Sequence, residues 1–289
     1  MESQILTVDG NQWNSPASDA GWISAVEDGK VLYFPQLAFQ LSPAEQALLR
    51  PELLHQGVRN ISRDANGQLK GVAGDEAAQA QVGAMMARFA SQATTLVGSL
   101  LPGYSQYLRA APTSLRPTQV STRRQSWRAD DRRLHVDAFP SRPNRGERIL
   151  RVFSNINPHG EPRVWRVGEP FVDVARRFLP PARRYSPAQA RLLNALHVTK
   201  SLRSEYDHLM LQLHDGMKSD MRYQRESAQV TMPFPSGSTW VCFSDQTVHA
   251  AMSGCNMIEQ TFHLPVQRQY NPQASPLAIL TRLAGHALI

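Results

Sequence analysis

Hydrophobic and polar positions follow two periods along this chain, and each period predicts a different kind of element. Short apolar runs separated by polar turns predict strands or extended segments over residues 1–40. Apolar side chains recur at helical spacing between residues 75 and 101, which predicts one long amphipathic helix. A Ser N-cap followed by Pro and Glu predicts a second helix start at residues 42–45.

The second half of the chain returns to strands on both sides of a helical block. Helical spacing with a proline break predicts helices within 171–198, and a second helix spans 205–223. Alternating or short β-branched runs predict the strands, which are 149–158, 163–167, 228–232, 239–243 and 260–265. An apolar stripe predicts a C-terminal helix over 275–289. This order favours an α+β protein with a mainly β core.

Composition adds a basic charge balance to this picture. The 289 residues carry 31 Lys and Arg against 24 Asp and Glu, a net charge of +7. Arginine supplies most of the positive charge and binds carboxylate and phosphate through a planar fork, which favours an anionic partner. That partner is a small acid, an anionic lipid or a nucleic acid. A generally basic surface without a specific partner is the alternative.

The chain carries no signal that predicts secretion or membrane insertion. Its two cysteines do not form a CxxC pair, and the N-terminal stretch lacks a basic segment followed by an apolar one. No apolar run reaches the roughly 20 residues that span a bilayer. We therefore expect a soluble cytoplasmic protein with reduced thiols that contacts a membrane surface at most.

Candidate chemistry centres on the triplet His135-Val136-Asp137. On a strand, residues two apart point to one face, so the imidazole and the carboxylate can meet. His249 follows about 110 residues later, a separation that suits a jelly-roll barrel, in which distant strands meet at one open end. Two histidines and one carboxylate hold non-haem Fe(II) with open positions. His214 and Asp215 are interpreted instead as polar residues on the outer face of a helix.

An iron centre of this kind uses O2 and 2-oxoglutarate, and the co-substrate's remote carboxylate needs a cation. Arg151, on the strand after the triplet, is the first choice, and Arg268 is the second. Asn155 and Asn157 are expected to donate hydrogen bonds nearby. A structural ion pair between Arg151 and one of three glutamates, at 147, 161 or 169, is the alternative.

Arginines are dense over residues 106–134, just before the triplet. We expect four of them to converge on the rim of the site and bind substrate, with a solvated face as an equal alternative; they are Arg123, Arg124, Arg128 and Arg132. The chain lacks a GxSxG elbow, a GxGxxG loop and a P-loop. Zinc hydrolysis on the same ligands would need an acid or base that the sequence does not single out.

Three blocks of the sequence resemble the Kdo hydroxylases, within residues 105–270. They are SWRADDRRLHVDAFPSRPNRGERILRVFSNINPHGEPRVWRVGEPF, EYDHLMLQLHDGMKSDMRYQ and FPSGSTWVCFSDQTVHAAMSGCNMIEQTFHLP. The resemblance implies a double-stranded β-helix, or jelly-roll, with N-terminal and inserted helices, and iron on His135, Asp137 and His249. We expect a single domain over 1–289. Its parts are an N-terminal strand and helix region (1–105), a core (106–270) with a helical insertion (171–223), and a C-terminal helix (271–289).

The resemblance also implies an activity in lipopolysaccharide assembly. Carbon 3 of a Kdo sugar on Kdo-lipid A would be hydroxylated with O2 and 2-oxoglutarate, giving D-glycero-D-talo-oct-2-ulosonic acid, succinate and CO2. The partner would be an anionic glycolipid and not a nucleic acid, met in peripheral contact with the cytoplasmic face of the inner membrane. Two alternatives stay open: a related dioxygenase acting on nucleic acid or another anionic substrate, and an inactive jelly-roll that binds lipid.

Overall fold

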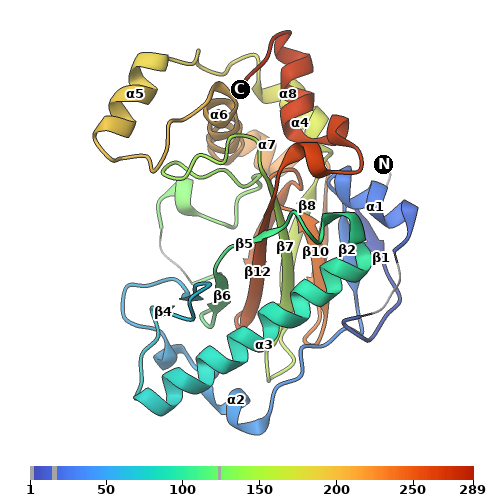
Figure 1. Ribbon diagram of the computed structural model, residues 1–289, viewed down its shortest axis with the longest axis vertical. Coiled ribbons are helices and arrows are strands. Elements are labelled where there is room, and N and C mark those ends of the chain that lie inside the picture. The colour runs from blue at the N-terminus through green and yellow to red at the C-terminus, as the bar shows by residue number, and fades with distance from the viewer. Residues whose placement is uncertain (1–2, 15–17, 123–124) are drawn as a thin grey trace.

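The computed structural model describes residues 3–14, 18–122 and 125–289, and its centre is a pair of facing β-sheets (Figure 1). The strands are β1 (Ile5–Thr7), β2 (Val31–Phe34), β3 (Ile61–Arg63), β4 (Leu69–Lys70), β5 (Arg109–Ala110), β6 (Thr113–Arg116), β7 (Arg148–Asn155), β8 (Arg163–Gly168), β9 (Gln229–Phe234), β10 (Thr239–Phe243), β11 (His249–Ser253) and β12 (Met257–Leu264). In the larger sheet the order is β1-β2-β10-β7-β12-β6-β3-β4, and β5 pairs with β12.

The smaller sheet has the order β11-β8-β9 and gains an extra partner at its edge. There, an isolated antiparallel bridge joins His135 to His249 on β11. The four central strands of the larger sheet, β6-β12-β7-β10, are antiparallel to their neighbours. Two antiparallel sheets whose strands alternate along the chain form a jelly-roll. The predicted fold class is confirmed, and β1 to β4 extend the larger sheet with strands from the N-terminal region.

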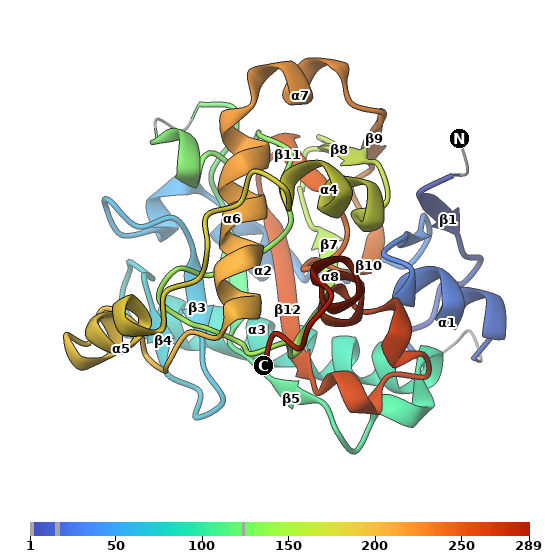
Figure 2. The same ribbon diagram turned by 90° about the horizontal axis from the view of Figure 1, so that it is seen from above.

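Helices cover the outer face and one end of the sheets. They are α1 (Ala20–Glu27), α2 (Pro43–Leu48), α3 (Glu76–Leu100), α4 (Phe171–Phe178), α5 (Pro187–Ala195), α6 (Glu205–Ser219), α7 (Met221–Glu226) and α8 (Pro276–Ala284). Helix α3 crosses the outer face of the larger sheet (Figure 1). Helices α4, α6 and α8 lie over the end of the strands, as the view from above shows (Figure 2).

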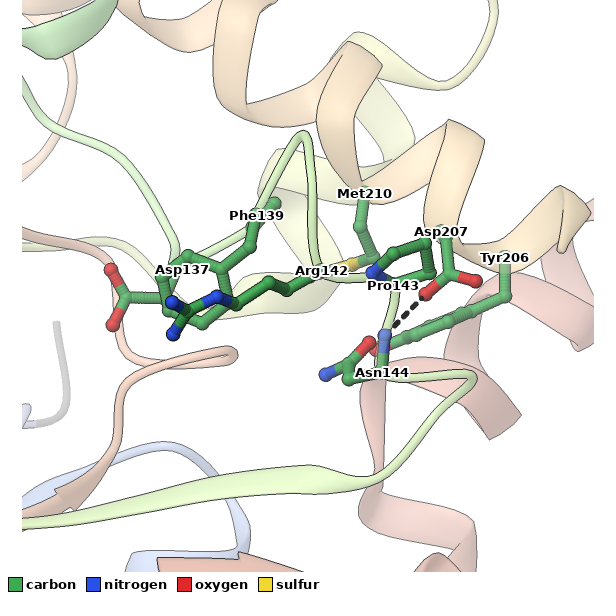
Figure 3. A pocket seen from close by; sticks show the side chains of 9 residues that line it. Asp137, Phe139, Arg142, Pro143, Asn144, Tyr206, Asp207 and Met210 are labelled. Carbon is green, nitrogen blue, oxygen red and sulfur yellow. Dashed lines mark hydrogen bonds between the residues drawn. The ribbon is translucent and has the colours of Figure 1, made fainter. Parts of the chain in front are cut away.

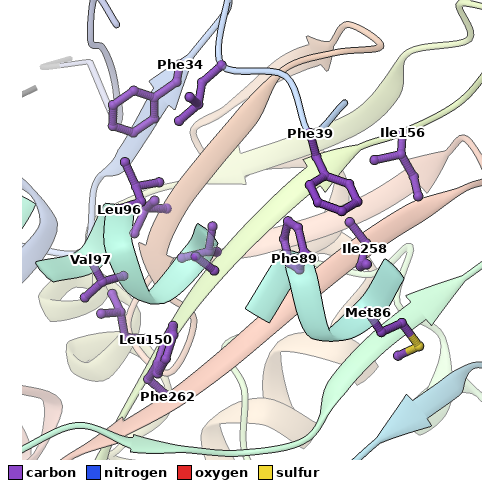
Figure 4. Packing of buried hydrophobic residues seen from close by; sticks show 14 of the residues in the cluster. Phe34, Phe39, Met86, Phe89, Leu96, Val97, Leu150, Ile156, Ile258 and Phe262 are labelled. Atoms are coloured by element: carbon purple, nitrogen blue, oxygen red, sulfur yellow. The ribbon is translucent and has the colours of Figure 1, made fainter. Parts of the chain in front are cut away.

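Helix α3 confirms the predicted 75–101 helix and explains why its stripe is apolar. Asp75 caps its first turn, and the residues of the stripe are fully buried. They pack against the outward side chains of the larger sheet, where Phe89 lies near Ile258 and Val97 lies near Leu150 (Figure 4). Burying a side chain of this size contributes roughly 1.5–3 kcal/mol, so this contact anchors the helix to the sheet.

A second apolar layer, between the sheets, is aromatic. The rings of Phe153, Phe234 and Trp240 stack at centroid distances of 4.1–5.4 Å, and Trp165 meets them edge-on. On its other side Trp165 stacks on the His249 ring at 4.9 Å. The inter-sheet core therefore continues directly into the residues expected to bind metal.

Three sequence predictions need correction. Residues 20–27, expected to be extended, form α1, because Asp19 caps it with two hydrogen bonds. The helix predicted over 205–223 is two helices, since the chain turns at Asp220 and that side chain caps α7. The His135–Asp137 stretch lies outside regular strands and makes a single bridge.

Among the described residues, no helix is both long and apolar enough to cross a bilayer.

Candidate metal centre

The centre forms where the His135 segment meets the first residue of β11. His135 and His249 exchange both backbone hydrogen bonds, at 3.0 and 2.9 Å, and their rings lie 4.6 Å apart. Two residues further on, the Asp137 amide donates to the Ser244 carbonyl at 2.8 Å, which keeps the chain extended. Because side chains of an extended chain alternate between its two faces, His135 and Asp137 both point into the barrel. Leu134 and Val136 pack outward, in the apolar layer under α4 and α6.

Backbone carbonyls fix the tautomer of both imidazoles. Nδ1 of His135 lies 2.7 Å from the Arg133 carbonyl, and Nδ1 of His249 lies 2.8 Å from the Thr247 carbonyl. A carbonyl oxygen only accepts, so each Nδ1 carries the proton and each Nε2 keeps a lone pair. Metal-ligating histidines are oriented by this kind of outer hydrogen bond.

The third donor is the Asp137 carboxylate. One ligand atom from each of His135, Asp137 and His249 lies within 4.8 Å of the other two. The Nε2 atom of His135 is 3.8 Å from Oδ1 of Asp137. The Oδ2 atom is buried and forms an ion pair with Nη2 of Arg151 at 3.0 Å. Two imidazoles and one carboxylate whose donor atoms converge in this way fit a divalent metal such as Fe(II).

Electrostatics keep all three donors in the form that binds metal. Burial acts to raise the pKa of Asp137, but the Arg151 guanidinium and the two imidazoles outweigh it and hold that pKa well below its usual range. Burial lowers the pKa of His135, and neighbouring His249 and Lys218 lower it further. Burial also lowers the pKa of His249. At neutral pH the site presents one carboxylate and two neutral imidazoles.

Two cavities meet at the loop that follows Asp137. One, of about 550 Å³, contains His135 and Asp137 in its wall and is lined on one side by α6. The other, of about 810 Å³, contains Arg151 and Glu259. Phe139 contributes to both. A narrow pocket beside them runs from Asp137 to Tyr206 and Met210 on α6 (Figure 3).

The loop after Asp137 is held in place from α6. Asp207 accepts a hydrogen bond from the backbone amide of Asn144 at 3.0 Å (Figure 3). It accepts a second from the backbone amide of Arg145 at 2.9 Å. The same carboxylate forms a capping box with Ser204 at the start of α6. The loop that lines both cavities is thus fixed to the helix that lines one of them.

Arg151 lies beside the metal ligands and not beside the glutamates named as alternatives. It extends from β7 with 12% of its side chain exposed, and its Nη2 atom is 3.0 Å from Oδ2 of Asp137. Its Nη1 atom is 3.7 Å from Glu259. Arg268, the second choice, lies in a 3-10 turn (Val266–Arg268) with its guanidinium 4.1 Å from the Tyr107 ring. The structure therefore places the first choice, and not the second, at the site.

The two asparagines are not brought to the centre. Asn155 ends β7, and its amide donates to the carbonyls of Glu161 and Phe234. The Asn157 side chain accepts from the amides of His159 and Glu161. Both asparagines shape the turn at the far end of β7. The metal ligands lie near the start of this strand, where Ile149 bonds to Ser244 and Ser244 bonds to Asp137.

The predicted arginine rim is reduced to one described residue. Arg128 lines the 550 Å³ cavity, stacks on Trp127 and pairs with Asp215 at 2.8 Å. The Arg132 guanidinium donates hydrogen bonds to the Asp130 carboxylate and to the Ser121 carbonyl. Arg123 and Arg124 lie outside the described residues.

Sequence reasoning missed the contribution of α6. His214, interpreted as an outer-face residue, lines the 550 Å³ cavity with its ring 5.5 Å from the His135 ring. Lys218, one turn later, lines the same cavity and is 1% exposed. Their spacing of four residues places them on one helix face, and this spacing is the sequence signal that could have grouped them.

Comparison with known proteins agrees with this geometry. The family model described as 3-deoxy-D-manno-oct-2-ulosonic acid (Kdo) hydroxylase matches residues 9–287. A structure of the Kdo hydroxylase KdoO with alphaketoglutarate and Fe(III) is 42% identical, covers 99% of this chain and 97% of its own, and has a TM-score of 0.93. A cobalt(II) complex of KdoO is 42% identical, covers 99% and 98%, and has a TM-score of 0.95. KdoO is named there as a non-heme Fe(II) alphaketoglutarate dependent dioxygenase. Comparison with curated proteins gives no match.

Proposed function

The chain belongs to the Kdo hydroxylase family, and we propose that it is an Fe(II)- and 2-oxoglutarate-dependent dioxygenase that hydroxylates carbon 3 of a Kdo sugar on Kdo-lipid A. One observation carries the proposal. His135, Asp137 and His249 converge with their donor atoms within 4.8 Å, in protonation states suited to a divalent metal, and His135 and Asp137 line a cavity.

Each side chain has a defined task in this proposal. Fe(II) held by two imidazoles and a carboxylate supplies, with 2-oxoglutarate and O2, the oxidation of a C–H bond. His135 and His249 present their Nε2 lone pairs, because the carbonyls behind them hold the Nδ1 protons. Asp137 supplies the negative charge, which Arg151 stabilises from 3.0 Å.

Arg151 is also proposed to bind the remote carboxylate of 2-oxoglutarate. Its Nε atom is buried and has no hydrogen-bond partner among the described residues. A buried donor of this kind is satisfied when a carboxylate reaches it. Because Arg151 lines the 810 Å³ cavity, the co-substrate would approach from that side. The sugar would then occupy the 550 Å³ cavity, where Arg128 offers a cation at the rim.

Peripheral contact with an anionic membrane is the second part of the proposal, and the segment around α5 supports it. Residues 180–204 hold five basic residues and no acidic one. Large apolar side chains of this segment are 44–63% exposed; they are Leu192, Leu196, Val198 and Leu202. The segment projects from the body of the protein (Figures 1 and 2). Exposed apolar residues flanked by Arg and Lys favour the interface of an anionic bilayer.

The same segment borders both cavities. Lys200 lines the larger cavity and Arg203 lines the one beside His135. Docking through α5 would therefore bring the cavity mouths near the head groups. Basic residues contribute ~1 kcal/mol each near such a surface. A glycolipid acceptor would keep its acyl chains in the bilayer while its sugar enters the site.

The decisive test is the coupling of 2-oxoglutarate turnover to acceptor. Purified protein is given Fe(II), 2-oxoglutarate and Kdo-lipid A, and both succinate and hydroxylated sugar are measured. We expect the two products in equal amounts, and neither after metal removal. Stimulation by methylated oligonucleotides but not by Kdo-lipid A would favour the nucleic-acid alternative. Lipid binding without the visible band of an anaerobic iron–2-oxoglutarate complex would favour an inactive binder.

A further inference from the structure

Lys218 is a buried cation in the wall of the 550 Å³ cavity, and the proposed hydroxylation has so far given it no role. It lies near the end of α6, is 1% exposed, and lines the 550 Å³ cavity together with His135 and Asp137. Four residues earlier on the same helix face, the His214 ring is 5.5 Å from the His135 ring. The lysine is therefore on the side of the metal centre where the sugar is proposed to enter.

The ammonium group has unused donor capacity. Nζ of Lys218 donates to the Arg128 carbonyl at 3.0 Å. No carboxylate among the described residues lies within 4.0 Å of it, although Asp131 and Asp137 stand in the same cavity wall. An ammonium has three N–H donors, so two of them have no hydrogen-bond partner among the described residues. A buried cation without a contacting anion is costly, and a ligand anion would remove that cost.

The acceptor's own chemistry requires a cation close to the metal. In a 3-deoxy-oct-2-ulosonic acid, carbon 1 is the carboxylate and carbon 3 is the methylene proposed to be oxidised. A single carbon separates them. When carbon 3 faces the metal, the carboxylate is therefore held a few ångströms from it, inside the cavity and away from the rim.

The other cations of this cavity are less well placed for that anion. The Arg128 side chain is 63% exposed and already pairs with Asp215. Arg203 donates to the Pro140 carbonyl, and Arg59 is exposed at the mouth. Arg151 lies in the other cavity and contacts Asp137 and Glu259. Lys218 combines full burial, a place in the same cavity wall as His135 and two N–H donors without a partner in the described part of the chain.

We propose that the Lys218 ammonium binds the carbon 1 carboxylate of the acceptor sugar and so directs carbon 3 toward the metal. This inference rests on the proposed function and names the residue that selects an acidic sugar. Lys218 is a binding and positioning residue here, since it touches the substrate away from the reacting carbon. A purely structural role, balancing the nearby aspartates, would affect folding but not the choice between acid and neutral sugar.

The test compares two acceptors: Kdo-lipid A and its carbon 1 carboxamide, which has the same shape without the charge. In the wild-type protein we expect kcat/KM to favour the acid by about 10- to 100-fold, the range for a hydrogen bond to a charged group. Lys218→Met should lower the ratio to near one, because kcat/KM for the acid should fall while kcat/KM for the carboxamide stays unchanged. Lys218→Arg, which keeps the charge, should retain part of the preference. Lys30→Met, which removes a positive charge between α1 and β2, is the matched control and should keep the full ratio.

The anaerobic iron–2-oxoglutarate band, measured on each variant, separates acceptor binding from damage to the centre. We expect the band of Lys218→Met to match wild type. An acid preference that persists in Lys218→Met, or is lacking in wild type, overturns the inference while leaving the hydroxylase proposal intact. If Lys218→Met does not fold, the comparison of acid and carboxamide in wild type still tests the inference, because a lack of acid preference there overturns it. If wild type forms the band but hydroxylates neither acceptor, the proposed function falls and this inference with it.

Discussion

Arg148 and Asp245 form an ion pair that is entirely inside the protein, with side chains 0% and 1% exposed and an Nε–Oδ2 distance of 2.8 Å. Asp245 also accepts the backbone amide of Ile149, and Arg148 donates to the Gln246 side chain. The pair joins the start of β7 to the turn that leads to His249. Ser244, in that turn, accepts the amide of Asp137. One buried pair thus braces the segments that carry two of the proposed ligands.

Removing one partner should therefore destabilise the fold strongly. For Asp245→Asn we expect the free energy of unfolding to fall by about 3–5 kcal/mol, because the Arg148 charge stays buried without its partner. Urea unfolding followed by circular dichroism measures the change. The control is Arg222→Ala, which breaks a pair whose side chains are 82% and 57% exposed and should cost under about 0.5 kcal/mol. Equal effects of the two variants would contradict this role for the buried pair.

Metal binding should stabilise the protein through the three converged donors. Co(II), which is stable in air, should raise the Tm of wild type, since the folded state holds the site and the unfolded state does not. At 100 times its Kd the gain is about 2.7 kcal/mol. His135→Ala and His249→Ala should lose the Tm shift. His286→Ala, an imidazole with 55% side-chain exposure, should keep it. A full shift in His135→Ala would rule out this ligand set.

Arg151→Met should weaken 2-oxoglutarate binding by about 10- to 100-fold, because a charge-assisted, bidentate contact is lost. Titration of the anaerobic iron–2-oxoglutarate band gives the Kd. Arg151 also lies 3.0 Å from Asp137, so the Co(II) affinity is measured in parallel to separate the two effects. Arg268→Met, which removes the guanidinium over Tyr107, is the control and should bind as wild type. Weaker binding in Arg268→Met alone would reverse the assignment.

The exposed apolar side chains of α5 should matter for membranes and not for folding. We expect a Leu192→Ser and Leu196→Ser double variant to bind vesicles containing anionic lipid more weakly than wild type in sedimentation assays. Its unfolding free energy should change little, since both side chains are already about 60% exposed. Leu283→Ser, on α8, is the control because Leu283 is an exposed leucine away from α5. Unchanged vesicle binding by the double variant would remove α5 as the docking element.

Both cysteine thiols should react slowly in the folded protein. Burial raises the pKa of Cys242 to about 12, and burial with the Glu161 carboxylate raises the pKa of Cys255 to about 11. Because the thiolate is the nucleophile, a pKa of about 11 leaves roughly one reactive molecule in a thousand at pH 8. Iodoacetamide labelling followed by mass spectrometry should be slow at pH 8, faster toward pH 10 and complete after unfolding. Rapid labelling of the folded protein at pH 8 would show that the thiols are not shielded.

Elements whose cause is local could be predicted from the amino-acid sequence. The apolar stripe of α3, the capping box at Ser42 and the strands on either side of the helical block are set by side-chain periodicity and by residues a few positions apart. The triplet at His135 could also be found, because its two ligands are near neighbours in the chain. The pairing of His135 and Asp137 with His249 followed from donor chemistry and from the resemblance to a family.

Which polar residues share the cavity depends on tertiary packing and could not be predicted from the sequence. His214 and Lys218 have the spacing of an ordinary helix face, and only the packing of α6 across the barrel end turns that face toward the metal ligands. Asn155 lies four residues from Arg151 on one strand, yet the strand carries it to the opposite end of the barrel. Such placements depend on contacts between residues far apart in the chain. Periodicity and short-range spacing carry no record of those contacts.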